Sequence, residues 1–158
     1  MKRSPELLDI EARWRLGLVP MEEIPRWATE QLSSESVSPT LLQLALCDRD
    51  DDREIGRLFR ELLEESGGGE MSPTDALRFY ARKVSRAILA RDTGPKEGAE
   101  SIWRATLVVG EPDFHELDAF IYAASEMSDR PTDRQLFADA IFAEAARWAR
   151  SDLDNPRS

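Results

Sequence analysis

Cysteine and histidine are almost absent from this sequence. Its 158 residues include one cysteine, Cys47, and one histidine, His115. A single cysteine excludes an internal disulfide framework and is typical of a reducing compartment. A single histidine argues against a serine triad and against the usual zinc ligand sets. We therefore predict no catalytic residue, no metal and no cofactor. We expect the protein not to be an enzyme, although carboxylate chemistry stays open in so acidic a chain.

Long hydrophobic runs are also missing. No apolar stretch approaches the roughly 18 residues that a membrane span needs. Two basic residues follow the first methionine, but charges interrupt the sequence after them, so no signal-peptide core forms. We expect a cytoplasmic protein with no membrane partner.

Basic side chains are outnumbered by acidic ones. The 31 acidic and 21 basic side chains give a formal net charge of -10 and an isoelectric point near 4.7. Nucleic-acid backbones are bound by clustered Lys and Arg, so we predict no nucleic-acid partner. An acidic balance favours basic partners and speeds encounter with them, but it also keeps proteins soluble. The charge alone leaves both interpretations open.

Helical periodicity occurs along most of the sequence. Apolar residues recur at 3.6-residue spacing, as in Ile55, Leu58 and Leu62, and no stretch shows sustained apolar–polar alternation. The pattern predicts an all-α fold, a single-domain bundle over 1–158 with about eight helices. Their expected ranges are 5–16, 22–33, 39–47, 52–65, 73–92, 96–109, 114–127 and 132–150.

Serine, proline and glycine mark the expected helix ends. Ser-Pro pairs at 38–39 and 72–73 are typical helix starts, because serine caps free amides and proline is tolerated at the first helical position. The stretch 66–70 is expected to be a flexible glycine-rich loop, and 151–158 a frayed tail. The last helix is apolar around most of its circumference, which predicts a central position in the bundle. Four glycines lie where helices are expected to stop: Gly17, Gly67, Gly94 and Gly110.

Three stretches resemble known motifs but fail at demanding positions. HELDA has Ala119 where a helical zinc motif needs its second histidine. DRDDDRE, residues 48–54, begins like a calcium loop, but Arg53 replaces the turn glycine. We interpret it as capping and favourable charge at a helix start, and whether it does more stays open. The glycines at 67–69 are not followed by Lys-Ser or Lys-Thr, so they form no phosphate loop.

Two charge patterns remain. Arg78, Arg82 and Arg86 are spaced four apart, which stacks three guanidinium groups along one helical edge. Whether they bind an anion or pair internally stays open. The run 111–129 has the opposite character, with six carboxylates and no Lys or Arg.

Part of the acidic run is predicted to form an interaction face. On the expected helix 114–127, Leu117 and Phe120 point inward, so Asp118 and Tyr122 share another face. Aromatic residues anchor interfaces and acids steer approach, which favours a basic protein partner. The alternative is that Tyr122 packs under a neighbouring helix while the acids are solvated. The predicted partner-binding residues are Glu111, Asp113, Phe114, Glu116, Asp118, Tyr122, Glu126 and Asp129.

Two segments carry a resemblance. EGA and IWR in 96–104, followed by ELD, YAASE and DRP in 115–148, resemble a recurrent pattern in small, acidic, all-helical bacterial proteins, an uncharacterised family. The size, acidity and sequence style of that family are similar to those of immunity proteins that neutralise secreted bacterial toxins. The likeness is an analogy, and it implies no functional residue.

The expectation for function follows from these patterns together. We predict a non-enzymatic protein-binding module of the immunity or inhibitor type that occludes a basic partner through its acidic and aromatic face. The alternative is a helical accessory subunit or a small-molecule binder, whose site would be an apolar pocket between helices. The sequence indicates neither the partner's identity nor the oligomeric state.

Overall fold

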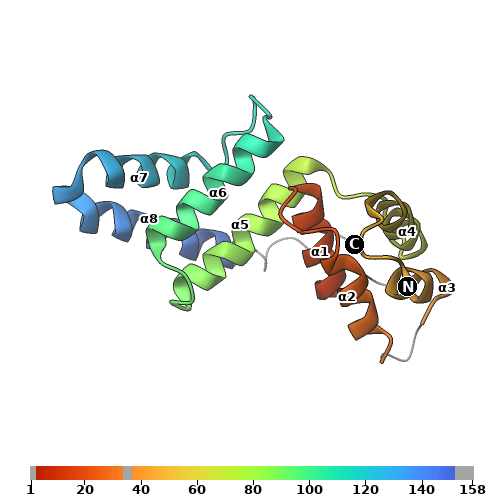
Figure 1. The fold of residues 1–158 in the computed structure, drawn as a ribbon. Coiled ribbons are helices and arrows are strands. Elements are labelled where there is room, and N and C mark those ends of the chain that lie inside the picture. Colours follow the sequence, from red (N-terminus) through yellow and green to blue (C-terminus); the bar gives the residue numbers. More distant parts are fainter. Residues whose placement is uncertain (1–2, 34–36, 152–158) are drawn as a thin grey trace. The chain divides into compact units, whose positions relative to one another are not determined.

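The computed structural model describes residues 3–33 and 37–151, which are α-helical throughout with turns between (Figure 1). Eight α-helices, one 3-10 turn and no strand occur in these ranges. The all-α prediction is confirmed. The helices divide at Ser72 into two compact units, unit 1 within residues 1–72 and unit 2 within 73–158. The single-domain interpretation stays a prediction, and the frayed tail falls outside the described residues from position 152.

Unit 1 contains four helices around an aromatic centre. They are α1 (Pro5–Arg15), α2 (Glu23–Gln31), α3 (Pro39–Leu46) and α4 (Asp52–Glu65). The Phe59 ring is fully buried, with Trp14 and Trp27 edge-on to it at centroid distances of 5.1 and 6.3 Å. Such edge-to-face contacts add to the free energy gained from burying the rings themselves. Around them lie Leu7, Ile10, Ile24, Leu44, Ile55, Leu58 and Leu63.

Side-chain caps start three of these helices. Ser4 accepts a hydrogen bond from the Leu7 amide, and Ser38 accepts one from the Leu41 amide, each at 3.1 Å. The Asp51 carboxylate does the same for the Glu54 amide at 3.1 Å. The cap at Ser38 is the one that the Ser-Pro pair predicts, and DRDDDRE provides the cap of α4.

Polar contacts from α1 and from Arg3, just before it, hold the glycine-rich stretch after α4. Glu11 is fully buried, and its carboxylate accepts from the Met71 amide at 2.7 Å and pairs with the Arg3 guanidinium at 2.8 Å. Arg3 also donates to the Ser66 hydroxyl at 3.0 Å, and Arg15 pairs with Glu70. The stretch expected to be a flexible loop is thus tied to α1 and to Arg3 at several points.

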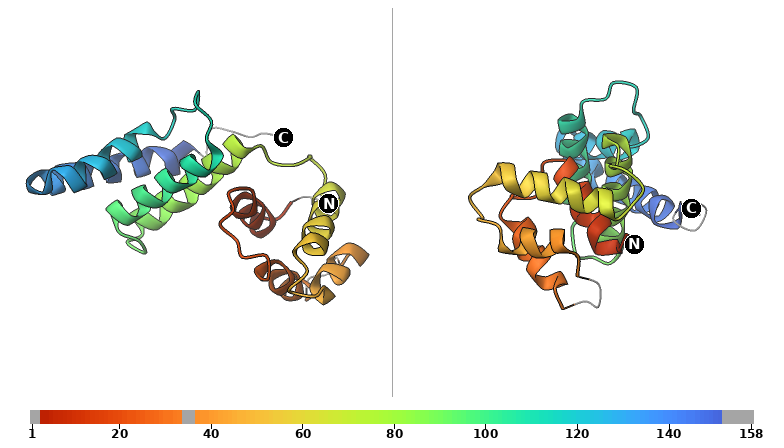
Figure 2. Two further views of the ribbon diagram at one scale, coloured as in Figure 1. Left: turned by 45° about the horizontal axis from the view of Figure 1, so that its top comes forward. Right: turned by 90° about the vertical axis from the view of Figure 1, so that its right-hand side faces the viewer.

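Unit 2 is a closed arrangement of four helices. They are α5 (Pro73–Leu89), α6 (Pro95–Val109), α7 (Asp118–Asp129) and α8 (Arg134–Arg150), with the 3-10 turn η1 (Pro131–Asp133) before α8. Each helix packs against the next, and α8 returns to pack against α5 (Figures 1 and 2). The large, fully buried side chains of the unit's core include Leu77, Ile88, Ile102, Leu117, Phe120 and Ile141.

Two expected helix ends differ from the structure. Gly94 does not stop α5: that helix ends at Leu89, and Arg91 has the left-handed backbone with φ 64°. Gly94 is instead the N-cap of α6, with an extended backbone (ψ 155°). The helix expected from 114 begins only at Asp118, because the residues before it form turns. Among the helices of the described ranges, none is long and apolar enough to span a membrane.

Candidate functional site

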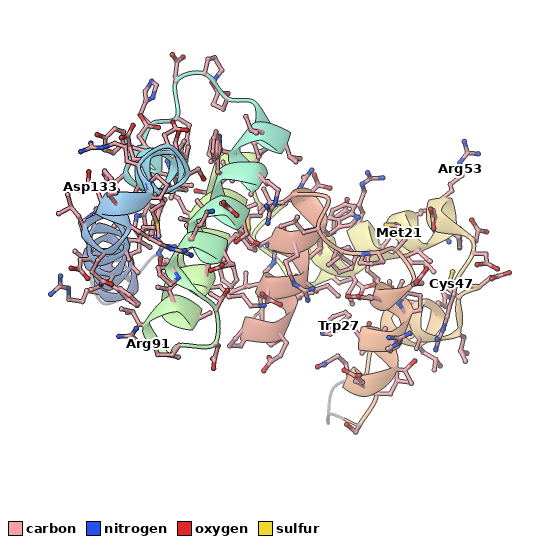
Figure 3. All side chains as sticks on the ribbon, turned by 60° about the vertical axis from the view of Figure 1, so that its left-hand side comes forward. Met21, Trp27, Cys47, Arg53, Arg91 and Asp133 are labelled. Carbon is pink, nitrogen blue, oxygen red and sulfur yellow. The ribbon has the colours of Figure 1, made fainter. Side chains whose placement is uncertain are left out.

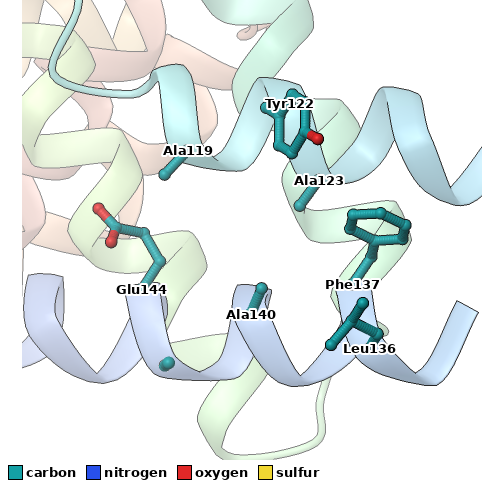
Figure 4. Close-up of a pocket in the computed structure, with 8 residues that line it drawn as sticks. Ala119, Tyr122, Ala123, Leu136, Phe137, Ala140 and Glu144 are labelled. Carbon is teal, nitrogen blue, oxygen red and sulfur yellow. The ribbon is translucent and has the colours of Figure 1, made fainter. Parts of the chain in front are cut away.

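An apolar groove lies between α7 and α8 within unit 2 (Figure 4). Its volume is about 440 Å³. Ala119, Tyr122 and Ala123 from α7 face Leu136, Phe137 and Ala140 from α8 in the close-up. The two remaining lining residues are Ala143 and Glu144. Four alanines leave the space between the helices unfilled, since a methyl group is all that each contributes.

Tyr122 and Leu136 are the prominent side chains of this groove. They are 61% and 62% exposed. The Tyr122 ring meets the buried Phe137 ring edge-on, with centroids 6.1 Å apart, so one edge of the tyrosine is supported while the rest faces solvent. Tyrosine combines a large apolar body with a polar tip, and this combination is enriched at interfaces. The sequence-based placement of Tyr122 on a surface next to the core agrees with this geometry.

The groove follows from the sequence of α8. Phe137, Ile141 and Trp148 face the core, as expected. Leu136, Ala140 and Ala143 lie on the other side and are exposed. A helix that is apolar on more than its core face was expected to be central and covered, but α8 has one exposed apolar side. That side faces Tyr122, and the surplus apolar residues are those that line the groove.

Glu116 is paired within unit 2. Both of its carboxylate oxygens accept hydrogen bonds from Arg78 of α5, at 2.8 and 2.9 Å. The same guanidinium pairs with Asp75 at 2.8 Å and lies 5.4 Å from the centre of the Phe114 ring. These contacts hold the segment before α7, which forms turns rather than helix, against α5. Glu116 and Phe114, both predicted to bind a partner, are thus engaged inside the unit.

The Arg78 pair also affects the titration of Glu116. The hydrogen bonds from Arg78 lower the pKa of this carboxyl below its ordinary value of 4.5, against the raising effect of partial burial. Because the pKa is lower in the folded state, the pair stabilises fully at pH values above 4.5. Its contribution is lost as the pH falls through the lowered pKa.

We therefore expect Glu116→Gln to destabilise the protein in a pH-dependent way. Glu116 is half-exposed, so solvent screening limits the cost to about 0.5–1 kcal/mol at pH 7. The difference between the two proteins should shrink as the pH falls below 4.5 to about 3, because the advantage of the lowered pKa is lost as the carboxyl takes up its proton. Urea unfolding at both pH values measures this. Glu111→Gln removes the same charge from an exposed residue and should change neither value, whereas an equal loss at both pH values would contradict the electrostatic origin.

The other predicted residues differ in how they are engaged. Asp118 is exposed and lies 3.1 Å from the His115 ring, and Glu126 lies 3.5 Å from Arg130. Both share a face of α7 with Tyr122, one turn before it and one turn after it. Three further carboxylates are exposed and have no ion pair within the described part of the chain: Glu111, Asp113 and Asp129. Asp118 and Glu126 therefore lie beside Tyr122 along α7 and form an acidic margin next to the groove, which Arg130 interrupts where it pairs with Glu126 and lies 5.4 Å from the centre of the Phe137 ring.

Arg78 and Arg82 of α5 and Cys47, which were not among the predicted partner-binding residues, make contacts within their own units. Arg78 pairs internally, and the Arg82 guanidinium lies 5.9 Å from the centre of the Trp148 ring. Cys47 ends α3 and is half-buried (Figure 3). Burial, followed by the charges of Asp51, Glu54 and Asp48, raises the pKa of its thiol, which disfavours the reactive thiolate. No three potential metal ligands are grouped together within 3–33 and 37–151.

Sequence reasoning missed the α8 half of the groove. Leu136, Ala140 and Glu144 were not among the predicted site residues, and Glu144 closes one end, accepting from the Trp148 indole at 3.1 Å. The available signal was the surplus of apolar residues on α8. Comparison of the chain with known protein families, with characterised proteins and with solved structures finds no match. The resemblance of 96–104 and 115–148 to small acidic bacterial proteins stays a prediction.

Proposed function

We propose that this chain is a non-enzymatic protein-binding module that takes a basic protein partner at the α7–α8 groove. The observation that carries the proposal is the exposed pair Tyr122 and Leu136 beside carboxylates of α7. Isolated exposed apolar residues are common on protein surfaces, but contiguous ones with a charged margin are typical of interaction sites.

The charges and the apolar groups would act at different stages of binding. Asp118 and Glu126 supply a negative field that attracts a basic surface, and such steering raises association rates by ~10–10³-fold. Tyr122 and Leu136 then lose water against apolar groups of the partner, which slows dissociation. Binding of this kind can inhibit by covering the partner's own site, as an immunity-type protein would. The setting proposed for this action is the cytoplasm.

Capture from a lysate of the host cell, followed by variants, tests the proposal. The immobilised protein should retain a basic protein, and raising the salt to about 0.5 M should release it, because exposed charges are then screened over a few ångströms. Asp118→Arg and Tyr122→Ala should each lower capture about tenfold. The matched charge control is Asp50→Arg in unit 1, which changes the net charge equally at an exposed residue. Capture that survives both groove variants, or falls equally with Asp50→Arg, would count against this face.

The same groove favours one alternative, a small-molecule binder. Its volume lies within the ~300–1,000 Å³ of typical ligand sites, and its lining is apolar apart from Glu144 and the Tyr122 hydroxyl. That alternative predicts saturable binding of neutral apolar compounds that shifts the amide signals of Ala123 and Ala140 at every salt concentration. The protein-binding proposal predicts salt-dependent shifts with a basic protein instead.

A further inference from the structure

The alanines of the groove set what can enter it. Ala119, Ala123, Ala140 and Ala143 place only methyl groups between α7 and α8. Small residues allow another backbone or a bulky apolar side chain to approach closely. Along α8 the lining extends from Leu136 to Glu144, which is about 12 Å at 1.5 Å per residue. The groove thus matches about two turns of a helix, the length over which side chains at i, i+3, i+4 and i+7 share a face.

The charge around the groove indicates which charge its occupant carries. Residues 111–139 contain eight carboxylates, two arginines and no lysine. Asp118 and Glu126 are one turn before and one turn after the groove residue Tyr122 on α7, and Asp139 is on α8 three residues after Leu136. A second copy of this chain would present the same negative face, and like charges set opposite one another cost several kcal/mol in an interface. Charge complementarity therefore favours a basic occupant over self-association.

The backbone around the groove favours a helical occupant over an extended one. Extended peptides bind by adding a strand to the free edge of a sheet, and the described residues of this chain contain no strand. Both walls are α-helices whose amides and carbonyls are already paired along the helix. What the walls offer is apolar side-chain surface, which is how grooves bind the apolar face of an amphipathic helix.

We propose that the occupant of the α7–α8 groove is a basic amphipathic helix of the partner protein. This inference rests on the proposed function and specifies the class of its partner. Apolar side chains of that helix pack over the alanine floor between Tyr122 and Leu136. Its Lys and Arg side chains lie along the margin of Asp118, Glu126 and Asp139.

A synthetic peptide of about 18 residues, five turns of helix, provides the probe. It has Leu and Ala on one face and Lys on the other. The control peptide has the same composition in an order that forms no apolar face. Fluorescence anisotropy measures affinity, and amide shifts of the protein locate the peptide. We expect the amphipathic peptide to bind at least tenfold more tightly than its control and to shift the amide signals of Ala119, Ala123 and Ala140.

Two leucine variants in unit 2 make the test specific. Leu136→Glu places a charge in the groove, whereas Leu107→Glu places the same charge on α6 at a residue that is 68% exposed. Both variants become more negative, so simple attraction of a basic peptide would strengthen in both. We expect Leu136→Glu to weaken binding about tenfold and Leu107→Glu to leave it within about twofold. Far-UV circular dichroism of both variants confirms that they are folded.

Each other outcome overturns the helical occupant. Equal binding of the two peptides would show charge attraction only, and unchanged binding by Leu136→Glu would place the peptide elsewhere. Sedimentation showing a dimer that Leu136→Glu dissociates would assign the groove to a second copy. If a host protein is captured in a salt-sensitive and Tyr122-dependent way but the peptide does not bind, the proposed function stands and the helical occupant is wrong.

Discussion

Replacing Glu11 by alanine is expected to destabilise unit 1 by about 3 kcal/mol. The carboxylate is fully buried, where it pairs with Arg3 and accepts from the Met71 amide. Alanine would leave the Arg3 guanidinium, which is 13% exposed, beside an empty space, and would leave a backbone amide without its acceptor. Breaking a buried pair by removing one partner costs about 3–5 kcal/mol, because the remaining charge stays desolvated.

The same reasoning gives the controls for Glu11. Glu6 lies on the same helix and is exposed, so Glu6→Ala should change stability by no more than about 0.5 kcal/mol. Replacing both partners, as Arg3→Met with Glu11→Leu, should recover the part of the loss that comes from the unpaired Arg3 charge, although the Met71 amide still lacks its acceptor. Urea unfolding, together with hydrogen exchange of the unit 1 amides, measures all of these. Equal unfolding midpoints for Glu11→Ala and Glu6→Ala would show that the pair does not stabilise the unit.

Replacing Gly98 by valine is expected to destabilise unit 2 by about 3 kcal/mol. Gly98 is buried where α6 crosses α5, and a Cβ atom there would lie 2.6 Å from Ile88 Cδ1 and 2.7 Å from Ile88 Cγ1. Ile88 is itself fully buried, so it has no free space into which it could move. Forcing extra carbon into a packed core costs about 1–3 kcal/mol, and a β-branched side chain is at the upper end. Urea unfolding measures the loss.

Replacing glycine by alanine is expected to stabilise the protein at one buried glycine and to destabilise it at another. Gly56 lies inside α4, and the nearest atom to an added Cβ, Met21 Cε, is 3.8 Å away, an ordinary contact. Gly56→Ala should therefore stabilise by up to about 1 kcal/mol through helix propensity alone. Gly98→Ala should destabilise in the native background and stabilise in an Ile88→Ala background, where the two close atoms are gone. Stabilisation by Gly98→Ala in both backgrounds would contradict close packing at this crossing.

Local signals made most of the fold predictable from the sequence. Ser38, Asp51 and Gly110 act within a turn of the residues that they cap, so sequence spacing alone locates those helix ends. Gly98 shows the opposite case. In the sequence it is a glycine inside EGA with low helix propensity. Only the close approach of Ile88 from α5 explains why this position has no side chain.

The candidate site was predictable in part for the same reason. Helical spacing places Asp118 and Tyr122 together on α7, because that relation lies within one element. Spacing along one helix contains no information about Arg78, which is 38 residues from Glu116 in the chain. It also cannot show that Leu136 and Tyr122 face one groove. Long-range pairing and the meeting of two helices depend on tertiary packing, which overrides local patterns.

The contacts of Arg3 and Glu11 also set an order of events during synthesis. Their partners Ser66 and Met71 are 63 and 60 residues further along the chain. A ribosome adds about 5–20 residues per second, so roughly 3–12 s pass before these partners exist. During that interval the Glu11 carboxylate can pair with Arg3 but lacks the Met71 amide, and α1 lacks its ties to the glycine-rich stretch. The contacts of α1 with the glycine-rich stretch are thus the last to become possible in unit 1. The residues made just before α5 are those that hold the first helix in place.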